Sequence, residues 1–275
     1  MKRYRFLKFS LDTHRNILDF DGLEEIKKEI IKDLSLKYGE LNFDIKLKRY
    51  KEIKKPAISV IGEHSFLLED IFGAYVMGNF YSATTAACCL GERIFNDLIL
   101  RLAQYYKTSP HYKKVYMRKA FYSWSEAIGI LSDWKITDES DELWTAYDRL
   151  GKIRTDVVHY QEKEIDLQSI SFEAIRLINS IIERLFSLED NKEYFIYFEV
   201  PGELFIKKEA ETIPIVKEFF LPNCVLVGPA YELSIEKDTN RWLVNDNNVY
   251  ESREVSDEEF IELRNAFRET LSKKL

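Results

Sequence analysis

Apolar residues recur at steps of three and four positions almost without interruption from Glu63 to about Asp190, which is typical of amphipathic helices. The longest helix is expected over residues 79–106, where small side chains in the apolar stripe let a neighbouring helix approach closely. That stripe holds Phe80, Ala83, Thr84, Ala87, Cys88, Gly91, Phe95, Leu98 and Leu102. Further helices are expected from about Lys119 to Trp134, from Ser140 to about His159, and from Leu167 to Leu188. Helices joined by connections of this length predict an antiparallel bundle.

The bundle, residues 63–190, is preceded by a segment of different character, residues 1–62. A short strand is expected at residues 2–9, and a helix is expected from Leu23 to its closing residue, Gly39. The stretch from Ile45 to Lys55 holds six bases and one acid, and we interpret it as an exposed strand or a linker.

Residues 191–275 are expected to form a small, acidic α+β domain. Short β-branched and aromatic runs, YFIYFEV, NCVLV, YELSI and RWLV, are separated by turn residues. The runs IPIVKEFF and DEEFIELRNAFRETL are expected to be helical. The whole chain is therefore predicted to be mainly α, with an α+β C-terminal domain in which no residue pattern indicates chemistry.

The net charge of −7 lies entirely in this last domain, because residues 193–275 hold 17 acids and 10 bases while the rest of the chain is neutral. The three cysteines are too few for a disulfide framework, and no pair of them has metal-ligand spacing. No stretch of 18 apolar residues occurs, and the first residues lack the apolar core of a signal peptide. We therefore expect a cytoplasmic protein without a membrane span, a metal or another cofactor.

Arg154 is the residue that points most directly to chemistry. On a helical projection it lies among Leu143, Tyr147, Leu150, Val157 and Val158, which fall within about 60° of one direction. A guanidinium on an apolar stripe is costly to desolvate unless a carboxylate, a phosphate or an interface meets it. His159 follows five positions later, and the two side chains can converge only if the helix ends near Val158 or a second subunit supplies the partner.

The segment IRTDVVHY resembles the R-x4-6-H motif of the HEPN superfamily, with Arg154, four intervening residues and His159. The upstream run GNFYSATTAACCLGERIFNDLI is similar to an earlier helix of HEPN-like proteins. The resemblance covers roughly residues 65–190 and says nothing about the remaining segments.

This resemblance implies a HEPN-like bundle that acts as a homodimeric, metal-independent endoribonuclease, with a role as a toxin or in antiviral defence. Arg154 would hold the scissile phosphate, and His159 would exchange a proton with the RNA 2′-hydroxyl or the leaving oxygen, which gives 2′,3′-cyclic phosphate ends. The sequence departs from the family pattern at Thr155, because active members often have Asn, Asp or His directly after the arginine.

Two further groups of residues belong to this hypothesis. Glu92, at the edge of the 79–106 stripe, could orient Arg154 in the catalytic site, or it could be an ordinary exposed glutamate. The segment from Leu98 to Ser125 contains no acid, and its bases alternate with tyrosines, a combination that suits RNA or equally a solvated loop. The candidate RNA-binding residues there are Lys113, Lys114, Arg118 and Lys119.

Other functions stay open at this point. Arg154 and His159 could be structural, one bridging a carboxylate and the other capping the helix C-terminus. The bundle could be a non-catalytic HEPN-like dimerisation or binding module for RNA, a nucleotide or a partner protein. In a binding module of this kind, the acidic C-terminal domain would offer a docking surface for a regulatory protein.

Overall fold

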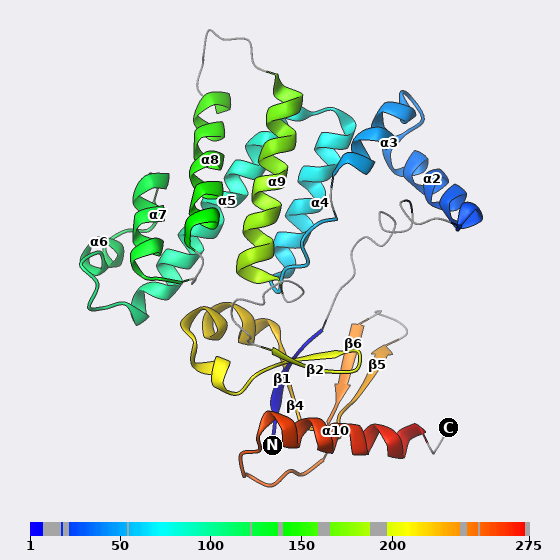
Figure 1. The fold of residues 1–275 in the computed structure, drawn as a ribbon, viewed down its shortest axis with the longest axis vertical. Coiled ribbons are helices and arrows are strands. Elements are labelled where there is room, and N and C mark those ends of the chain that lie inside the picture. Colours follow the sequence, from blue (N-terminus) through cyan, green and yellow to red (C-terminus); the bar gives the residue numbers. More distant parts are fainter. Residues whose placement is uncertain are drawn as a thin grey trace. The chain divides into compact units, whose positions relative to one another are not determined.

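The computed structural model describes residues 1–7, 18, 22–53, 55–121, 123–136, 140–158, 166–187, 197–236, 241–246 and 248–272. The chain divides into two compact units (Figure 1). One comprises Phe9–Glu193, which we call the helical unit, and the other comprises Met1–Lys8 with Tyr194–Leu275, which we call the C-terminal unit. The protein is mainly α-helical with a small α+β C-terminal part, as the sequence predicts.

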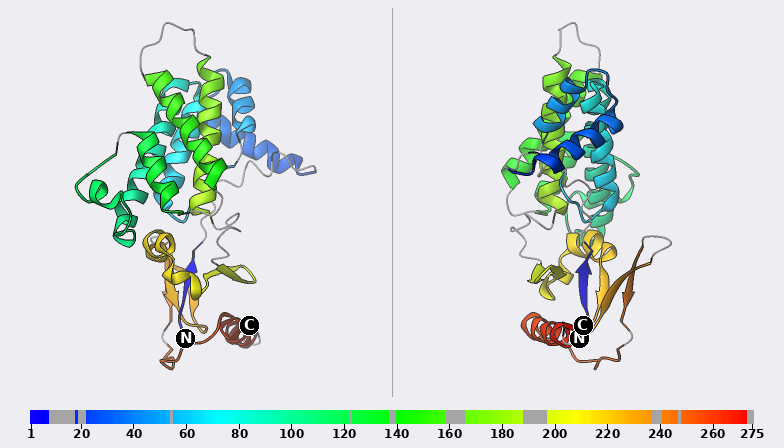
Figure 2. Two further views of the ribbon diagram at one scale, coloured as in Figure 1. Left: turned by 60° about the vertical axis from the view of Figure 1, so that its left-hand side comes forward. Right: turned by 90° about the vertical axis from the view of Figure 1, so that its right-hand side faces the viewer.

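The helical unit is built around the central helix α5. Its helices are α2 (Glu24–Tyr38), α3 (Phe43–Glu52), α4 (Gly62–Met77), α5 (Phe80–Leu102), α6 (Tyr112–Tyr116), α7 (Trp124–Asp133), α8 (Ser140–Val158) and α9 (Leu167–Phe186). Helix α5 contacts α4, α7, α8 and α9, and Figures 1 and 2 agree that α4 and α5 (cyan) lie beside α8 and α9 (green). Because α5 follows α4 after a turn at Gly78, where φ is 87°, these two helices form a hairpin.

The apolar stripe predicted for residues 79–106 is the buried face of α5. Its central side chains, including Ala83, Ala87, Phe95 and Leu98, are fully buried. The bundle core is therefore confirmed where the three- and four-residue periodicity is strongest.

The interpretation of Ile45–Lys55 as an exposed strand or linker is wrong, because most of this segment lies in helix α3. Its bases are used locally. The Lys46 ammonium donates to the carbonyl of Tyr38 at the end of α2 (2.7 Å), and the Arg49 guanidinium donates to that of Val76 near the end of α4 (3.4 Å). Cations at helix C-termini satisfy carbonyls that have no partner within the helix.

Helix α7 begins later than predicted, at Trp124 rather than near Lys119. The Ser123 hydroxyl accepts a hydrogen bond from the backbone N–H of Glu126 (3.3 Å), which caps the helix N-terminus. The basic residues before Ser123 are consequently outside this helix.

The C-terminal unit contains a four-stranded antiparallel sheet in the order β2-β3-β1-β4 and a separate hairpin of β5 with β6. The strands are β1 (Arg3–Phe6), β2 (Tyr197–Val200), β3 (Glu203–Ile206), β4 (Val225–Val227), β5 (Glu232–Glu236) and β6 (Arg241–Asn245). A π-helical turn at Val216–Phe220 and the helix α10 (Asp257–Ser272) match the two helical runs expected in the tail. The core of the C-terminal unit contains aromatic side chains from β2, β3 and α10, namely Phe198, Phe205 and Phe260.

The strand predicted near the N-terminus is β1, and it does not belong with residues 9–62. It pairs with β3 on one side and with β4 on the other, so the N-terminal strand lies inside the sheet of the C-terminal unit. The units thus differ from the expected segments 1–62, 63–190 and 191–275, since α2 and α3 fall in the helical unit.

The helices within the described ranges include none with the length and apolar character needed to cross a bilayer.

Candidate functional site

Arg154 on α8 and Glu92 on α5 form an ion pair. The distance from Arg154 Nε to Glu92 Oε2 is 3.2 Å, and their side chains are 32% and 21% exposed. The projection that placed Arg154 in the middle of the apolar stripe is therefore corrected. Its neighbour Ile153 is buried instead, and Arg154 lies at the edge of the buried face, where its guanidinium reaches solvent.

The contact through Nε determines what the rest of the guanidinium can do. Among the described residues, Glu92 alone is an ion-pair partner of Arg154, and the two terminal nitrogens make no hydrogen bond. Because Glu92 contacts Nε, the donors on the outer edge of the guanidinium remain for a second anion.

Arg154 lines a surface groove of about 490 Å³ between the start of α7 and the side of α8. Its other walls include Trp124, Arg149, Lys152 and Asp156. All of these residues belong to the helical unit. The groove is open and polar, so it suits a charged ligand that lies along the surface rather than one enclosed by the protein.

Two glycines let the Trp124 indole sit beside this groove. A Cβ on Gly151 of α8 would lie 3.0 Å from the indole, and a Cβ on Gly91 of α5 would also lie 3.0 Å from it. The ring of Phe95 meets the indole edge-on at 5.1 Å between ring centroids. The small residue at Gly91, which the sequence analysis placed in the middle of the stripe, thus allows the close approach that was predicted there.

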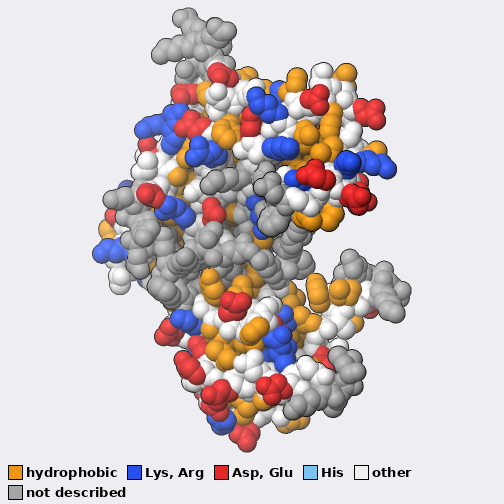
Figure 3. Space-filling model, turned by 45° about the vertical axis from the view of Figure 1, so that its right-hand side comes forward, with side chains coloured by type: hydrophobic (Ala, Val, Ile, Leu, Met, Phe, Trp, Pro, Cys, Tyr) orange, Lys and Arg blue, Asp and Glu red, His pale blue; other side chains and the backbone are white. Residues whose placement is uncertain are grey.

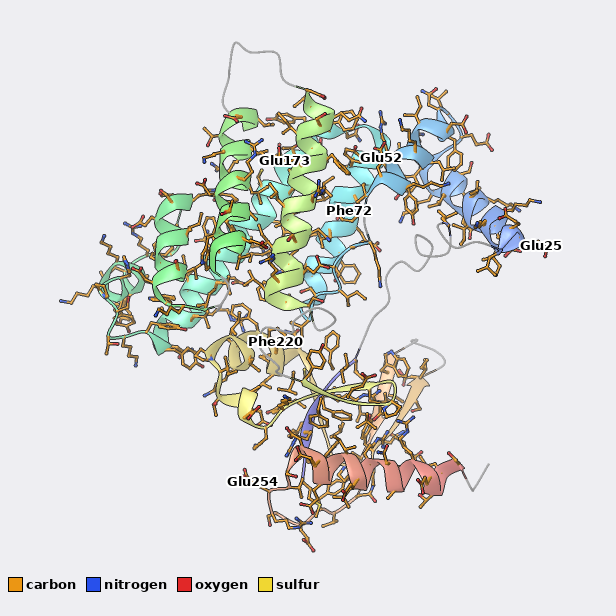
Figure 4. All side chains as sticks on the ribbon, in the orientation of Figure 1. Glu25, Glu52, Phe72, Glu173, Phe220 and Glu254 are labelled. Carbon is orange, nitrogen blue, oxygen red and sulfur yellow. The ribbon has the colours of Figure 1, made fainter. Side chains whose placement is uncertain are left out.

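The other bases of the groove have acidic partners within the chain. Lys152 Nζ lies 2.6 Å from Asp148 Oδ2, and Arg149 donates two hydrogen bonds of 2.7 Å to Glu173 (Figure 4 labels Glu173 on α9). The hydrogen bonds from Arg149 lower the pKa of Glu173, which favours its ionised form. Of the three basic side chains that line the groove, Arg154 is therefore the one with the most hydrogen-bond donors available for a ligand.

Cys88 lies close enough to Arg154 and Glu92 for their charges to act on its thiol. Burial raises the pKa of Cys88 to about 12, and its Sγ donates to the carbonyl of Leu150 (3.7 Å). The thiol is therefore neutral near pH 7, which makes it a poor nucleophile.

His159 lies outside the described residues, which on α8 extend to Val158. The geometry of the site is therefore that of Arg154, Glu92 and the groove beside them. Thr155, which departs from the family pattern, is exposed, and its hydroxyl donates to the carbonyl of Gly151 (3.1 Å). A threonine in this arrangement bonds to its own helix rather than to Arg154 or Glu92.

Comparisons of the chain with protein-family models, with characterised proteins and with solved structures found no match. The likeness to the HEPN superfamily therefore rests on the motif and on its position late in a helical bundle.

The candidate RNA-binding side chains Lys113, Lys114, Arg118 and Lys119 are all exposed, and the first two lie on the short helix α6. Arg118 is committed elsewhere, because its Nη1 donates to Glu126 of α7 (2.7 Å). On the face of the helical unit visible in Figure 3, lysine and arginine side chains are interspersed with acids rather than gathered in one patch.

The sequence analysis did not single out Trp124, Arg149 or Lys152. A signal for Trp124 was present, since Ser123 and Glu126 have the spacing of a helix N-terminal capping box that places Trp124 in the first turn. No local pattern indicated the pair of Arg149 with Glu173, because its members lie on different helices. Where the chain is described, no three His, Cys, Asp or Glu side chains gather as a metal site would require.

Proposed function

We propose that the helical unit is a metal-independent endoribonuclease of HEPN type, in which Arg154 binds the scissile phosphate and His159 transfers the proton. The observation that carries this proposal is the ion pair of Glu92 with Arg154, whose side chain lines a groove. Planar guanidinium edges match phosphate oxygens, and a fixed cation stabilises the charge that develops on them.

In the proposed reaction the RNA 2′-oxygen attacks the adjacent phosphorus as its proton leaves to a neutral imidazole. The bond from phosphorus to the 5′-oxygen breaks, and that oxygen receives a proton, which leaves 2′,3′-cyclic phosphate and 5′-hydroxyl ends. Histidine suits both transfers because its ordinary pKa lies near neutral pH. The protein would act as a homodimer in the cytoplasm, and a toxin or antiviral role follows from the family alone.

The first test compares RNA cleavage by the wild type, Arg154→Ala, His159→Ala and Arg93→Ala. The first two substitutions should reduce cleavage at least about a hundredfold, the usual minimum for losing an acid–base or phosphate-holding group. Arg93 is the matched control, because it neighbours Glu92 in sequence but pairs with Glu63 at 2.8 Å. Since Arg154 and Glu92 both reach solvent, the change in unfolding free energy for Arg154→Ala should stay below about 1 kcal/mol.

Three further measurements sharpen this test. Cleavage should persist in EDTA, and it should fail on RNA with a methylated 2′-oxygen. If the site is shared between two subunits, mixing Arg154→Ala with His159→Ala should restore part of the activity. Undiminished cleavage by His159→Ala, or a requirement for a divalent metal, would contradict the mechanism.

A non-catalytic binding module is the second candidate, and one observation favours it. Arg149 and Lys152 are paired with acids, so the groove offers few cations that could stabilise a transition state. This alternative predicts that the wild type binds RNA without cutting it and that Arg154→Ala weakens the binding.

A further inference from the structure

Two arginines on the same face of β1, Arg3 and Arg5, have different surroundings. Arg3 is 1% exposed, and its Nε donates to Asp257 Oδ1 (2.9 Å). Arg5 is 9% exposed, but its Nη1 is 3.8 Å from Glu203 Oε1, beyond hydrogen-bonding distance, and its buried Nε has no hydrogen-bond partner among the described residues. The Arg5 guanidinium also lies 5.0 Å from the centre of the Tyr231 ring. A buried guanidinium without a hydrogen-bonded carboxylate is unfavourable in the isolated protein.

The carboxylate nearest to Arg5 is already occupied by Arg264 of α10. Arg264 Nε and Nη2 donate to the two oxygens of Glu203 at 2.9 and 2.7 Å, and its Nη1 donates to the carbonyl of Tyr231 (2.7 Å). Burial alone would raise the pKa of Glu203, but the hydrogen bonds from Arg264 and the charges of Arg264 and Arg5 outweigh burial, so the pKa is lowered. Glu203 is therefore ionised at neutral pH, yet its single charge faces two guanidinium groups.

A third arginine lies one helical turn beyond Arg264. Arg268 is half-buried and donates to the carbonyl of Pro201 (2.8 Å), and none of the described carboxylates forms an ion pair with it. Arg5, Arg264 and Arg268 all line one hollow of about 340 Å³, and its other walls include two carboxylates, Glu203 and Glu232. The hollow thus gathers more positive than negative charge, although it lies in the unit that includes the acidic C-terminal segment.

We propose that this hollow binds a small molecule with a terminal phosphoryl group, held by Arg5 and Arg268 above the fixed Arg264–Glu203 pair. A phosphomonoester carries nearly two negative charges near pH 7, which suits two guanidinium groups that make no hydrogen bond to a described carboxylate. The hollow is at the small end of the range for ligand pockets, and the partly exposed Leu271 side chain provides apolar surface for the remainder of the ligand. The Tyr231 ring is fully buried, and it lies against the guanidinium groups of Arg5 and Arg264. This site is independent of the proposed nuclease site, since every residue that lines it belongs to the C-terminal unit.

Calorimetric titration of the full chain with glycerol 3-phosphate tests the proposal, with inorganic phosphate and acetate as comparison ligands at constant ionic strength. The wild type should bind glycerol 3-phosphate saturably, inorganic phosphate more weakly, and acetate weakest. Arg268→Gln and Arg5→Gln should each weaken binding about tenfold or more, the usual effect of removing a hydrogen bond between charged groups.

The matched control is Arg253→Gln, because Arg253 belongs to the same unit but pairs with Glu251 at 3.1 Å and does not line the hollow. The Arg253→Gln variant should bind glycerol 3-phosphate with the same affinity as the wild type. If Arg5→Gln disturbs the sheet, as circular dichroism would reveal, the half-buried Arg268 carries the test alone. The proposal is overturned if the wild type shows no saturable binding at millimolar glycerol 3-phosphate, if Arg268→Gln binds as tightly as the wild type, or if acetate binds as tightly as the phosphomonoester.

Discussion

At the scale of single residues, the groove beside Arg154 depends on how little space surrounds the Trp124 indole. A Cβ on Gly151 would meet three atoms of the indole at 3.0–3.1 Å, closer than normal van der Waals contact. The indole is also packed against Phe95 and Tyr147, so it cannot move away without disturbing buried rings.

Gly151→Ala should therefore destabilise the helical unit, although alanine is the better helix former. Overpacking of a dense core costs about 1–3 kcal/mol, and the gain in helix propensity offsets at most about 1 kcal/mol of it. Gly129→Ala on α7 is the matched control, because a Cβ there meets no atom within 4 Å, and it should stabilise the protein. Urea unfolding of both variants measures the two changes, and a stabilised Gly151→Ala would show that the indole is free to shift.

Single residues also show how much of the candidate site could be predicted from the sequence. The motif spacing singled out Arg154, and the position of Glu92 at the edge of the α5 stripe made it one possible partner, beside the alternative of an ordinary exposed glutamate. The ion pair agrees with the first of these alternatives. The helical projection failed for Arg154 because α8 packs against α5, α7 and α9, so its buried face is centred elsewhere than on the most apolar line. The partner of Arg149, Glu173, lies on another helix, and periodicity within one helix does not encode such a pair. The pair of Lys152 with Asp148 has the i,i+4 spacing of a helix, so the sequence does contain its signal.

At the scale of elements, helix α3 shows why the high number of bases in Ile45–Lys55 led to the wrong interpretation of this segment as an exposed strand or linker. Two of its bases, Lys46 and Arg49, donate to carbonyls near the ends of two other helices, and Arg49 also lies 4.8 Å from the ring centre of Phe80 on α5. A basic segment looks like a linker only if its charges are assumed to face solvent. The predicted helices α2, α5, α8 and α9, in contrast, were found within a few residues of their expected ends, because a long apolar stripe is a signal within one element.

The basic segment around α6 is predicted to contact RNA. Lys113, Lys114 and Lys119 are exposed and have no ion pair with a described residue, so each can contact an RNA phosphate. The triple change to Gln should lower RNA affinity and reduce the slope of log affinity against log salt by about two to three. Arg118 is left intact because it anchors α7 through Glu126.

The control for this experiment is the triple change of Lys28, Lys32 and Lys51 to Gln, on α2 and α3. These lysines are also exposed, and the substitution removes the same net charge from the same unit. An equal loss of affinity in both triple variants would mean that the net charge of the unit, not the segment around α6, governs binding.

At the scale of the whole molecule, the chain leaves the C-terminal unit after Lys8 and returns to it at Tyr194. Strand β1 lies between β3 and β4, and Arg5 is aligned with Phe205 on one side and Val225 on the other. No local pattern reveals a pairing across the entire helical unit, which is why the sequence assigned β1 to a separate N-terminal segment. The C-terminal unit has a cluster of buried side chains that includes Phe198, Phe205 and Phe260.

Tyr4→Pro should therefore unfold the C-terminal unit selectively. Tyr4 lies within β1 opposite Leu226, and a proline in an interior strand removes a ladder donor and costs about 3 kcal/mol or more. Hydrogen exchange should show lost protection in β3 and β4, while the amides of α5 and α9 keep theirs, because α5 and α9 belong to the other compact unit. Tyr4→Ala is the control for the lost side chain and should leave the sheet protected. Simultaneous loss of protection in α5 and α9 would instead mean that the two units unfold as one cooperative structure.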